Sequence, residues 1–400
     1  IYICFIKYNN MVNNITGSPV EGDDFFGREK EIEFVWRHIE KGNSLILSAP
    51  RRVGKSSLAK KVLGKAKENH WNILEINLEE VKTEEAFVKV FLEKLANQNW
   101  FSKIKDEASK KITYILESIK PSVGIGEANV KLEWKSKKND VYEELKKLLE
   151  HDKETLIMVD ELTVLLSSFI ENDPKEGKKN VEFFLNWLRS FRQVTGTKIR
   201  WIFCSSVGID NFTNQYNLSY TFNDVAPYPV GAFKKEKAKE LLTELAKSDN
   251  IEISDEIKEY LLDKIGWLLP YFIQILFSKF YHLVQVEEDE ISIETVEKAY
   301  QLLISEKHLN TWEERLKEYG LLEVPARELL KKLSVNKLGD GRSTLLAFLN
   351  IKIKNDEKAE DILNKLLYML QNDGYLIEEE LKYAFRSPLL RDFWFTRFSK

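Results

Sequence analysis

The sequence predicts an α/β protein with a parallel β-sheet, followed by a bundle of helices and a C-terminal winged helix. Up to about residue 230, short apolar segments alternate with amphipathic helical segments, which is typical of a parallel sheet with right-handed crossovers. Beyond that residue the strand segments disappear and helical periodicity takes over. Near the C-terminus two short strand segments follow helices, which is the outline of a winged helix. The length of 400 residues fits two or three domains.

Four segments are predicted to form the sheet, because each is short and largely apolar, as a strand buried on both faces should be. They are residues 44–48, 72–78, 155–159 and 199–204. Helices are predicted where apolar residues recur at helical spacing. They cover 29–40, 56–67, 84–96, 141–149, 181–192, 324–334 and 358–371, with a bundle over 233–280 and 293–304. Alternation over 123–134 predicts a hairpin, and 374–377 and 382–385 are the two C-terminal strands.

Composition limits the class of protein. Hydrophobic residues make up 43% of the chain and charged residues 31%, as in an ordinary globular protein. The net charge of −4 argues against a protein that coats nucleic acid through bulk charge, and leaves a local basic face open. Cys4 and Cys204 fit neither a disulfide framework nor a zinc site, and the five histidines lack ligand spacing. No stretch reaches the length of a membrane span, so we expect a cytoplasmic protein with no membrane partner.

A phosphate-binding loop is predicted between the first strand and the helix that follows it. Residues 49–56 match the pattern G-x-x-x-x-G-K-[ST] at every defined position except the first, where Ala49 replaces glycine. The backbone N–H groups of such a loop point inward at an anion, and the helix N-terminus adds a positive dipole. We expect Lys55 to reach the β- and γ-phosphates and Ser56 to ligate Mg²⁺. The residues expected to bind nucleotide here are Ala49, Pro50, Arg51, Arg52, Val53, Gly54, Lys55, Ser56 and Ser57.

An acidic pair follows the third predicted strand. Four apolar residues lead into Asp160 and Glu161, at the strand's carboxyl end. In a nucleotide site, Asp160 would hold the Mg²⁺ shell and Glu161 would polarise the attacking water. The alternative is that the pair merely caps the next helix.

These residues resemble the prokaryotic "archaeal ATPase" family, a group of STAND ATPases related to AAA+ and origin-recognition ATPases. Residues 25–29, Phe-Phe-Gly-Arg-Glu, are similar to the element that precedes the phosphate loop in that family. The resemblance implies that Phe26, Gly27 and Arg28 lie beside the adenine of ATP or ADP. It also implies a Mg²⁺-dependent ATPase with the P-loop NTPase fold, a helical lid and a C-terminal winged helix.

Two later segments extend the resemblance. Residues 201–208 look like the family's fourth core strand, which implies that Ser205 or Ser206 approaches the γ-phosphate, with Ser206 taken as the catalytic residue. Residues 266–271 resemble the lid motif, whose glycine and proline (here Pro270) lie over the adenine, although three residues separate them here. The expected domains are an N-terminal extension at 1–20, an ATPase core at 21–230 with an insert at about 98–152, a lid at 231–311 and a winged helix at 312–400.

Several arginines are candidates for sensing phosphate. Arg386, before the last helical stretch, could reach back toward the phosphates or lie on the surface. Arg189, Arg192 and Arg200 could each act on a neighbouring subunit's nucleotide or be ordinary helix-face arginines. Arg51 and Arg52 are expected to face solvent or a partner, because the loop binds phosphate through its backbone.

Two functions remain open. The first is a nucleotide-controlled switch, in which the lid and winged helix move and expose a surface for a protein partner or for self-assembly. The second is an ATPase that binds duplex DNA through the winged helix. The predicted recognition helix, residues 355–369, carries more acidic than basic residues, and the wing contains Glu378, Glu379 and Glu380. Phosphates would be repelled there, which favours a protein-facing role.

Overall fold

The computed structural model describes residues 12–17, 20, 22–50, 52–101, 105–123, 130–134, 137–149, 152–205 and 208–398. Arg51 and Ser206, both expected at the nucleotide, lie outside the described residues, as does Cys4. The chain forms two compact units. We call residues 28–48 and 55–230 the sheet unit, and residues 49–54 and 231–400, with the segment up to Gly27, the helical unit. Across the described residues, none of the helices has the length and apolar character needed to cross a membrane.

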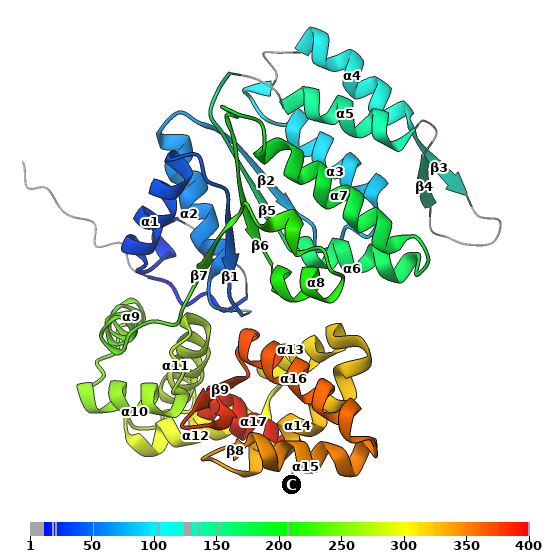
Figure 1. The fold of residues 1–400 in the computed structure, drawn as a ribbon. Helices are drawn as coiled ribbons and strands as arrows, with labels where there is room; N and C mark the ends of the chain where they lie inside the picture. The colour runs from blue at the N-terminus through cyan, green and yellow to red at the C-terminus, as the bar shows by residue number, and fades with distance from the viewer. Residues whose placement is uncertain are drawn as a thin grey trace, which may run out of the picture. The chain divides into compact units, whose positions relative to one another are not determined.

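The sheet unit is built on a five-stranded parallel sheet with the strand order β2-β5-β6-β1-β7 (Figure 1). The strands are β1 (Leu45–Ser48), β2 (Asn72–Asn77), β5 (Thr155–Asp160), β6 (Ile199–Cys204) and β7 (Ala226–Pro229). The parallel sheet and its four predicted strands, now β1, β2, β5 and β6, are therefore confirmed. All six residues of β5 are buried, as expected for a central strand.

The fifth strand, β7, was not predicted. Its sequence is Ala-Pro-Tyr-Pro, and proline cannot donate to a strand ladder. The structure places β7 at the edge of the sheet, where the N–H groups of Ala226 and Val230 donate to the carbonyls of Ser44 and Ser48. The prolines therefore cost no ladder hydrogen bond at these points. Local strand propensity does not predict this strand, because it takes no account of which N–H groups face the neighbouring strand.

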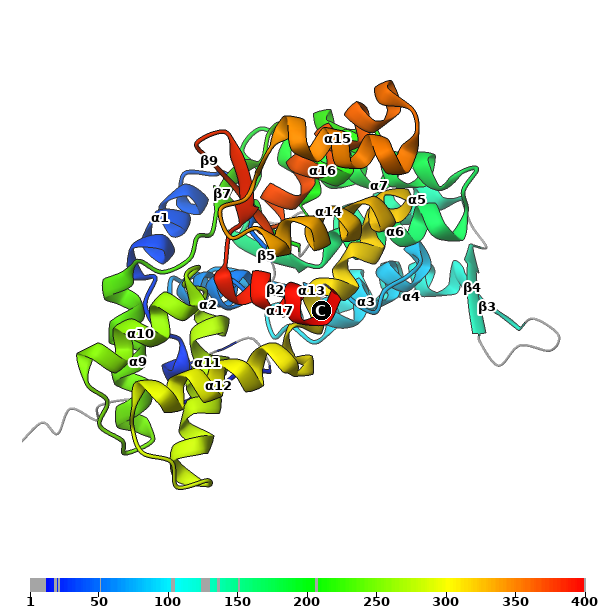
Figure 2. The same cartoon turned by 90° about the horizontal axis from the view of Figure 1, so that it is seen from below.

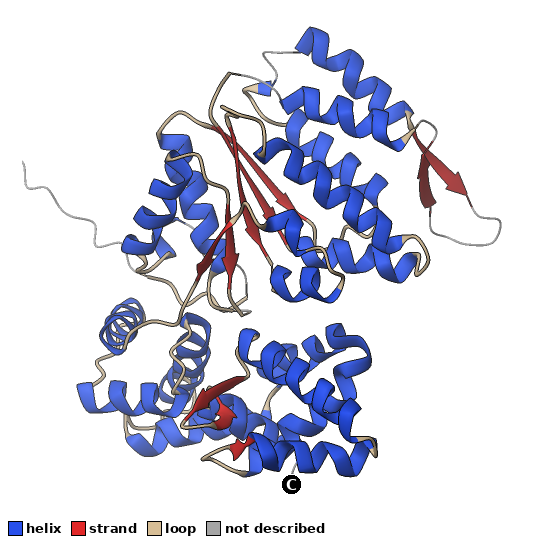
Figure 3. Ribbon diagram, viewed as in Figure 1, coloured by secondary structure: helices blue, strands red, loops and turns tan. Residues whose placement is uncertain are grey.

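Helices cover both faces of the sheet, with α1 and α2 on one side and α3 and α7 among those on the other (Figures 1 and 3). The helices of this unit are α1 (Glu29–Glu40), α2 (Lys55–Glu68), α3 (Glu84–Ala96), α4 (Lys105–Glu117), α5 (Lys138–Leu149), α6 (Leu162–Asn172), α7 (Gly177–Arg192) and α8 (Ile209–Gln215), with a 3₁₀ turn at Ser219–Phe222. Aromatic rings fill the core on the α3–α7 side, where Phe87, Phe184 and Trp187 pack edge to face or tilted.

The predicted hairpin exists as β3 (Ile119–Val123) paired antiparallel with β4 (Val130–Trp134). It begins four residues earlier than predicted.

The helical unit contains two groups of elements (Figure 2). The first is α9 (Lys235–Ser248), α10 (Asp255–Ile265), α11 (Pro270–Gln285) and α12 (Ile293–Ser305). The second is α13 (Asn310–Glu314), α14 (Glu323–Val335), β8 (Asp340–Gly341), α15 (Arg342–Ile353), α16 (Asp356–Asn372), β9 (Leu376–Glu379), β10 (Lys382–Phe385) and α17 (Pro388–Phe398). Further 3₁₀ turns lie at Gly22–Asp24, Lys307–Leu309 and Arg315–Leu322.

The three short strands of this unit form an antiparallel sheet of order β8-β10-β9. Both predicted C-terminal strands are confirmed, the first shifted by two residues. The two-residue strand β8 was missed, because a segment that short has no periodicity to detect.

Candidate functional site

The end of β5 and the start of α2 meet in the sheet unit, although they are about a hundred residues apart in the chain. Ser56, in the first turn of α2, donates a hydrogen bond from its Oγ to Oδ2 of Asp160 at 2.6 Å. Lys55, the first residue of α2, is buried close enough to Asp160 to act on its charge. The two motifs that the sequence predicts to share one site are therefore brought together.

Asp160 is held in a setting that disfavours its charge. Burial raises the pKa of this carboxyl, and the neighbouring Glu161 charge raises it further. The Ser56 hydrogen bond, the Lys55 ammonium and the Glu161 N–H, which donates to Oδ1 at 3.0 Å, act in the opposite direction. Burial is the largest contribution to the pKa of Asp160, so the ionised carboxylate stays destabilised despite these three groups. A bound cation would stabilise it.

Glu161 occupies an unusual backbone conformation. Its φ of 55° lies in the left-handed region, which non-glycine residues seldom adopt. It stands at the N-cap position of α6, yet its side chain makes no capping hydrogen bond. The alternative that this acid serves as a helix cap is therefore not supported. Backbone strain of this kind is often found at functional sites.

Ser205 is engaged with the helix that follows Glu161. The side chain is buried, and its Oγ accepts a hydrogen bond from the Thr163 N–H at 3.4 Å and bonds to the Thr163 hydroxyl. Ser205 therefore ties the end of β6 to the first turn of α6. This contact was missed because Thr163 belongs to no motif, and only the fold brings the two residues together.

The backbone of the phosphate loop accommodates Ala49. The described residues with positive φ do not include it, so its methyl group meets none of the left-handed strain that would require glycine. Positive φ occurs instead at Arg52 (66°) and Gly54 (96°). Val53 and Ser57, the other loop residues expected at the nucleotide, are buried.

Residues 50 and 52 of the loop pack within the helical unit. Pro50 is buried beside the backbone of Gly374. The Arg52 guanidinium carbon lies 4.5 Å from the ring centroid of Tyr271, in the first turn of α11. One face of the Arg52 guanidinium therefore packs on an aromatic ring of the same chain, while the side chain stays partly exposed. Pro270 occupies the first position of α11, where its missing N–H costs nothing.

The Phe-Phe-Gly-Arg-Glu element divides between the two units. Phe26 packs edge to face on Phe233 at 6.2 Å, and the Lys237 ammonium lies 5.2 Å from the Phe26 ring centroid. Gly27 has a φ of 70°, and a Cβ there would lie 3.2 Å from the Lys237 side chain. In the sheet unit Arg28 is buried and contacts Glu31 at 3.4 Å, and burial lowers the pKa of its guanidinium.

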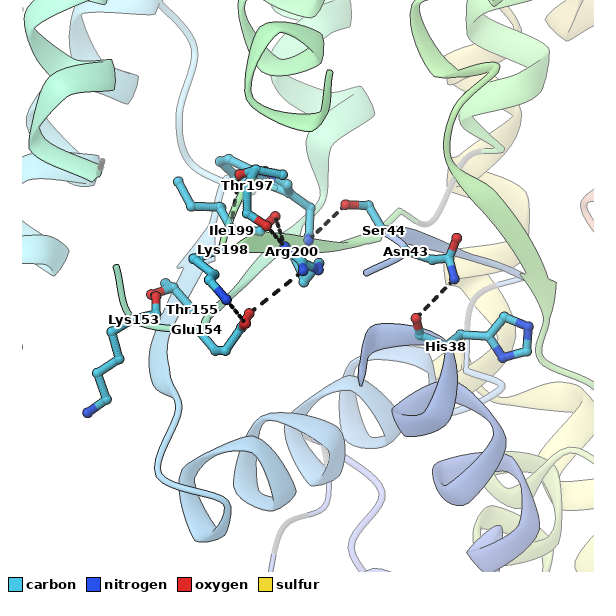
Figure 4. A network of polar contacts seen from close by, with 11 residues as sticks. His38, Asn43, Ser44, Lys153, Glu154, Thr155, Thr197, Lys198, Ile199 and Arg200 are labelled. Atoms are coloured by element: carbon cyan, nitrogen blue, oxygen red, sulfur yellow. Dashed lines mark hydrogen bonds and ion pairs between the residues drawn. The ribbon is translucent and has the colours of Figure 1, made fainter. Parts of the chain in front are cut away.

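Arg200 belongs to a polar network at the amino ends of the strands (Figure 4). Its guanidinium donates to the carbonyls of Thr197 and Ile199 and contacts Glu154 at 3.7 Å. The phosphate loop follows the carboxyl end of β1, so Arg200 lies at the opposite edge of the sheet. This placement favours the alternative that Arg200 stabilises the fold and does not act on a nucleotide.

The two candidates on helix α7, Arg192 and Arg189, also have partners inside the sheet unit. Arg192 is buried, pairs with Asp224 at 2.8 Å and donates to the Thr221 carbonyl at 2.6 Å. Arg189 donates to Asn223 at 3.2 Å. Most of the guanidinium N–H groups of Arg192 thus bond to acceptors in its own chain, which supports a structural role for this residue.

The site residues suit a magnesium-bound nucleotide. A serine hydroxyl and an aspartate carboxylate are oxygen ligands, and Mg²⁺ commonly takes only one or two protein ligands and keeps waters. Clusters of three or more His, Cys, Asp or Glu side chains arranged for a metal are absent from the described part of the chain. Ser56 and Asp160 would therefore hold the ion together with the nucleotide phosphates.

Comparison with known proteins decides the family. A family model described as "Novel STAND NTPase 1" matches residues 18–275. The chain belongs to this family. The STAND resemblance predicted from the loop and its flanking motifs is thereby confirmed, and the chain is a P-loop NTPase of the STAND type. No curated protein matches the sequence.

Solved structures with the same fold include two archaeal proteins. The Walker-type ATPase of Pyrococcus abyssi superposes with a TM-score of 0.64 at 16% identity, over 95% of this chain and 99% of that one. The ORC2 protein of Aeropyrum pernix, solved as ADPNP–ADP complexes, gives a TM-score of 0.53 at 11% identity, over 95% and 98% of the two chains. At these identities the similarity establishes the fold.

Proposed function

We propose that this STAND NTPase binds and slowly hydrolyses ATP, and that its nucleotide state controls a protein partner or its own assembly. The observation that carries the proposal is the hydrogen bond of 2.6 Å between Ser56 and Asp160, with Lys55 buried beside it. This arrangement joins the phosphate loop to the acidic pair, as phosphoryl transfer from ATP requires. The nucleotide complexes of the Aeropyrum ORC2 protein, which shares the fold, support the same class of ligand.

Each residue has a distinct role in this proposal. Lys55 and the N–H groups at the start of α2 bind the phosphates, and Ser56 and Asp160 hold Mg²⁺. The ion would supply charge neutralisation at the β- and γ-phosphates. Glu161 orients the attacking water and accepts its proton. Phe26, Gly27 and Pro270 contact the adenine, and Ser206 approaches the γ-phosphate.

We also infer that the last module of the helical unit is a winged helix. The element order α14-β8-α15-α16-β9-β10, with a three-stranded antiparallel sheet, supports this. Its charges support a protein partner over DNA. Glu378, Glu379 and Glu380 are exposed on the wing, and within the described residues none of them pairs with a lysine or arginine. A wing of this charge would repel phosphates.

Nucleotide binding and hydrolysis can be tested separately. Calorimetric titration with ATP and ADP, with and without Mg²⁺, should show binding of both nucleotides that is tighter when the ion is present. The Glu161→Gln variant should bind ATP as the wild type does and hydrolyse it about 100-fold more slowly, because a general base contributes 10²- to 10⁴-fold. Unchanged hydrolysis in this variant would remove the assignment of Glu161.

The switch is tested by mass photometry with ADP and with a non-hydrolysable ATP analogue. A change in oligomeric state, or in capture of a partner, between the two nucleotides supports the proposal. A mobility-shift titration with duplex DNA across salt concentrations tests the alternative. Tight binding that weakens steeply with salt would replace the protein-directed role with a DNA-directed one.

A further inference from the structure

Strongly exposed aliphatic side chains gather in the C-terminal module, which comprises α13 to α17. Among the described residues, seven valine, leucine or isoleucine side chains are at least 62% exposed, and six of them lie in this module. The six are Leu321, Val324, Val335, Leu338, Ile351 and Leu381. Single exposed aliphatic residues are normal on a protein surface, but their concentration in one module indicates a surface that another molecule covers.

The most exposed part of the small sheet is the turn between β9 and β10. Lys382 pairs with Glu379 in the ladder, so Glu380 and Leu381 form a two-residue hairpin turn. Both have positive φ, 50° and 63°, as a type I′ turn requires, although asparagine and glycine adopt this turn far more readily. The Leu381 side chain is 82% exposed. We call residues 378–381 the wing tip.

The wing tip is acidic. Burial and the facing carboxylate of Glu378 raise the pKa of Tyr383, so Glu378 is partly engaged within the ladder. Glu379 and Glu380 are exposed and form no ion pair with a described residue. With Lys382 as the one neighbouring cation, three negative charges stand beside one positive charge. An exposed leucine beside these carboxylates suits a protein surface that combines an apolar contact with cations.

A surface of the opposite charge lies at the C-terminal end of α14 and in the turn that joins this helix to β8. Lys331 and Val335 are one helical turn apart, on the same face of α14. Lys337 and Leu338 follow in the turn, where the Asn336 side chain accepts a hydrogen bond from the Leu338 N–H at 3.1 Å. The two lysines and the two aliphatic side chains are exposed, and neither lysine has an ion pair within the described part of the chain. We call these four side chains the basic patch.

Strand β10 separates the wing tip from the basic patch. The wing tip precedes Lys382, at the start of this strand. The basic patch adjoins its later part, because a Cβ on Gly339, which follows Leu338, would lie 2.4 Å from the Tyr383 carbonyl oxygen and 2.9 Å from Cβ of Ala384. Three residues of strand span about 10 Å. The hydrogen-bonded sheet maintains this separation, so the wing tip cannot fold onto the basic patch of its own chain.

The two surfaces complement each other in charge and in apolar character. A stable protein interface combines apolar anchors with opposite charges that fix its orientation. We infer that the wing tip of one copy of this chain binds the basic patch of a second copy, with Leu381 packing on Val335 and Leu338. The carboxylates of the tip face the lysines of the patch. This inference rests on the proposed function in one respect, since it assigns surfaces to the assembly named there, and it does not require ATP hydrolysis.

The test is sedimentation velocity over a series of protein concentrations, with ADP and with a non-hydrolysable ATP analogue. The wild type should associate reversibly in at least one nucleotide state, and more weakly as salt is added, because salt screens exposed charges. Two charge-reversed variants are compared with it. The tip variant combines Glu379→Lys with Glu380→Lys, and the patch variant combines Lys331→Glu with Lys337→Glu.

Each charge-reversed variant should stay monomeric alone, because like charges then meet at the contact. An equal mixture of the two variants should associate again, because every contact between a tip variant and a patch variant joins opposite charges. Association of the mixture, and of neither variant alone, identifies the second copy as the partner.

The Leu381→Gly variant separates loss of the contact from loss of folding. Glycine adopts positive φ without strain, so this variant should melt no lower than the wild type. Without the leucine it should associate at least about 10-fold more weakly, as expected for loss of an apolar anchor. The matched control is Val286→Ser. Val286 is 66% exposed but lies at the end of α11, outside the C-terminal module, and its replacement should leave association unchanged.

Three results would overturn the inference. They are a wild type that binds ATP and stays monomeric in both nucleotide states, charge-reversed variants that associate as the wild type does, and a mixture that associates no better than its components. The first would leave a different protein as the partner of these surfaces, and none of the three contradicts nucleotide binding. A wild type that assembles through these surfaces without binding nucleotide would instead refute the proposed function and leave this inference standing.

Discussion

The strands of the parallel sheet carry similar charged side chains at the side where they begin, the amino edge, and at the side where they end, the carboxyl edge. The two sides use these charges differently. At the amino edge, Arg200 and Lys198 share Glu154, and the Arg200 guanidinium also satisfies two backbone carbonyls (Figure 4). At the carboxyl edge, Asp160 is buried with its pKa raised, and Glu161 is held at positive φ. Charges at the first edge are neutralised within the chain, whereas at the second the Asp160 carboxylate is held where burial disfavours its charge.

The difference shows where the molecule is organised for a ligand. Side chains that pair with one another contribute to folding, and their removal should destabilise the protein. Side chains held in a strained or desolvated state lower stability and are retained where function requires them. The same residue types therefore have opposite expected effects on stability at the two edges of one sheet.

The largest effect is expected for Lys55→Met. Lys55 is the buried cation of the carboxyl edge, and its loss should weaken ATP binding or hydrolysis by about 100-fold or more, as for other groups that stabilise transferring phosphates. Calorimetry and phosphate-release kinetics measure both quantities. Lys198→Met, which removes an exposed cation at the amino edge, is the control and should leave both unchanged. If both variants behaved alike, the two edges would not differ in function.

A second prediction concerns Glu84, a buried acid on α3. Burial raises its pKa to about 7, although Lys138 pairs with it and Tyr142 contacts it at 3.5 Å. Ionised Glu84 therefore lowers the free energy of unfolding by on the order of 3 kcal/mol above pH 7, a penalty that fades as pH falls and is absent below about pH 4.5.

Glu84→Gln should consequently be more stable than the wild type above pH 7 and equal to it below about pH 4.5. Denaturant unfolding at several pH values measures this difference. A variant that is less stable at all pH values would show that the ion pair with Lys138 outweighs burial.

A smaller effect is expected for Arg200→Gln at the amino edge. Removing the guanidinium leaves Glu154 and two carbonyls without this partner, which should cost about 1–2 kcal/mol of stability. Nucleotide affinity should not change, because Arg200 lies at the edge opposite the phosphate loop. A fall in ATP affinity without a fall in stability would instead support a role at the nucleotide of a neighbouring subunit.

The sequence was most informative where function depends on neighbouring residues in the chain. The loop at 49–56 and the pair at Asp160 and Glu161 could be recognised because each lies directly after an apolar strand, within one short segment. The convergence of these two segments could also be expected, since the carboxyl ends of parallel strands share an edge.

Features that depend on distant partners were not predictable. β7 forms despite its prolines because β1 offers a free edge, and Ser205 acts through Thr163 on a different element. Among the candidate arginines, the sequence could not separate Arg192, which is buried and pairs with Asp224, from Arg386, which stacks on Trp267 and has no ion pair within the described residues, because these contacts come from remote segments. Local pattern thus finds the motifs, and only the fold shows which charges are already satisfied.

The central claim is tested most directly by the melting temperatures of Asp160→Asn and Arg200→Gln at pH 7.5, each with and without Mg²⁺ and ATP. Because the pKa of folded Asp160 is raised, its charge costs stability above that pKa, and the cost disappears below the ordinary aspartate range. We therefore predict that Asp160→Asn melts higher than the wild type without ligand and is not stabilised further by Mg²⁺ and ATP. Arg200→Gln should melt lower and keep the full ligand-induced rise. The opposite pattern, with Asp160→Asn destabilised and still responsive to Mg²⁺ and ATP, would contradict the account.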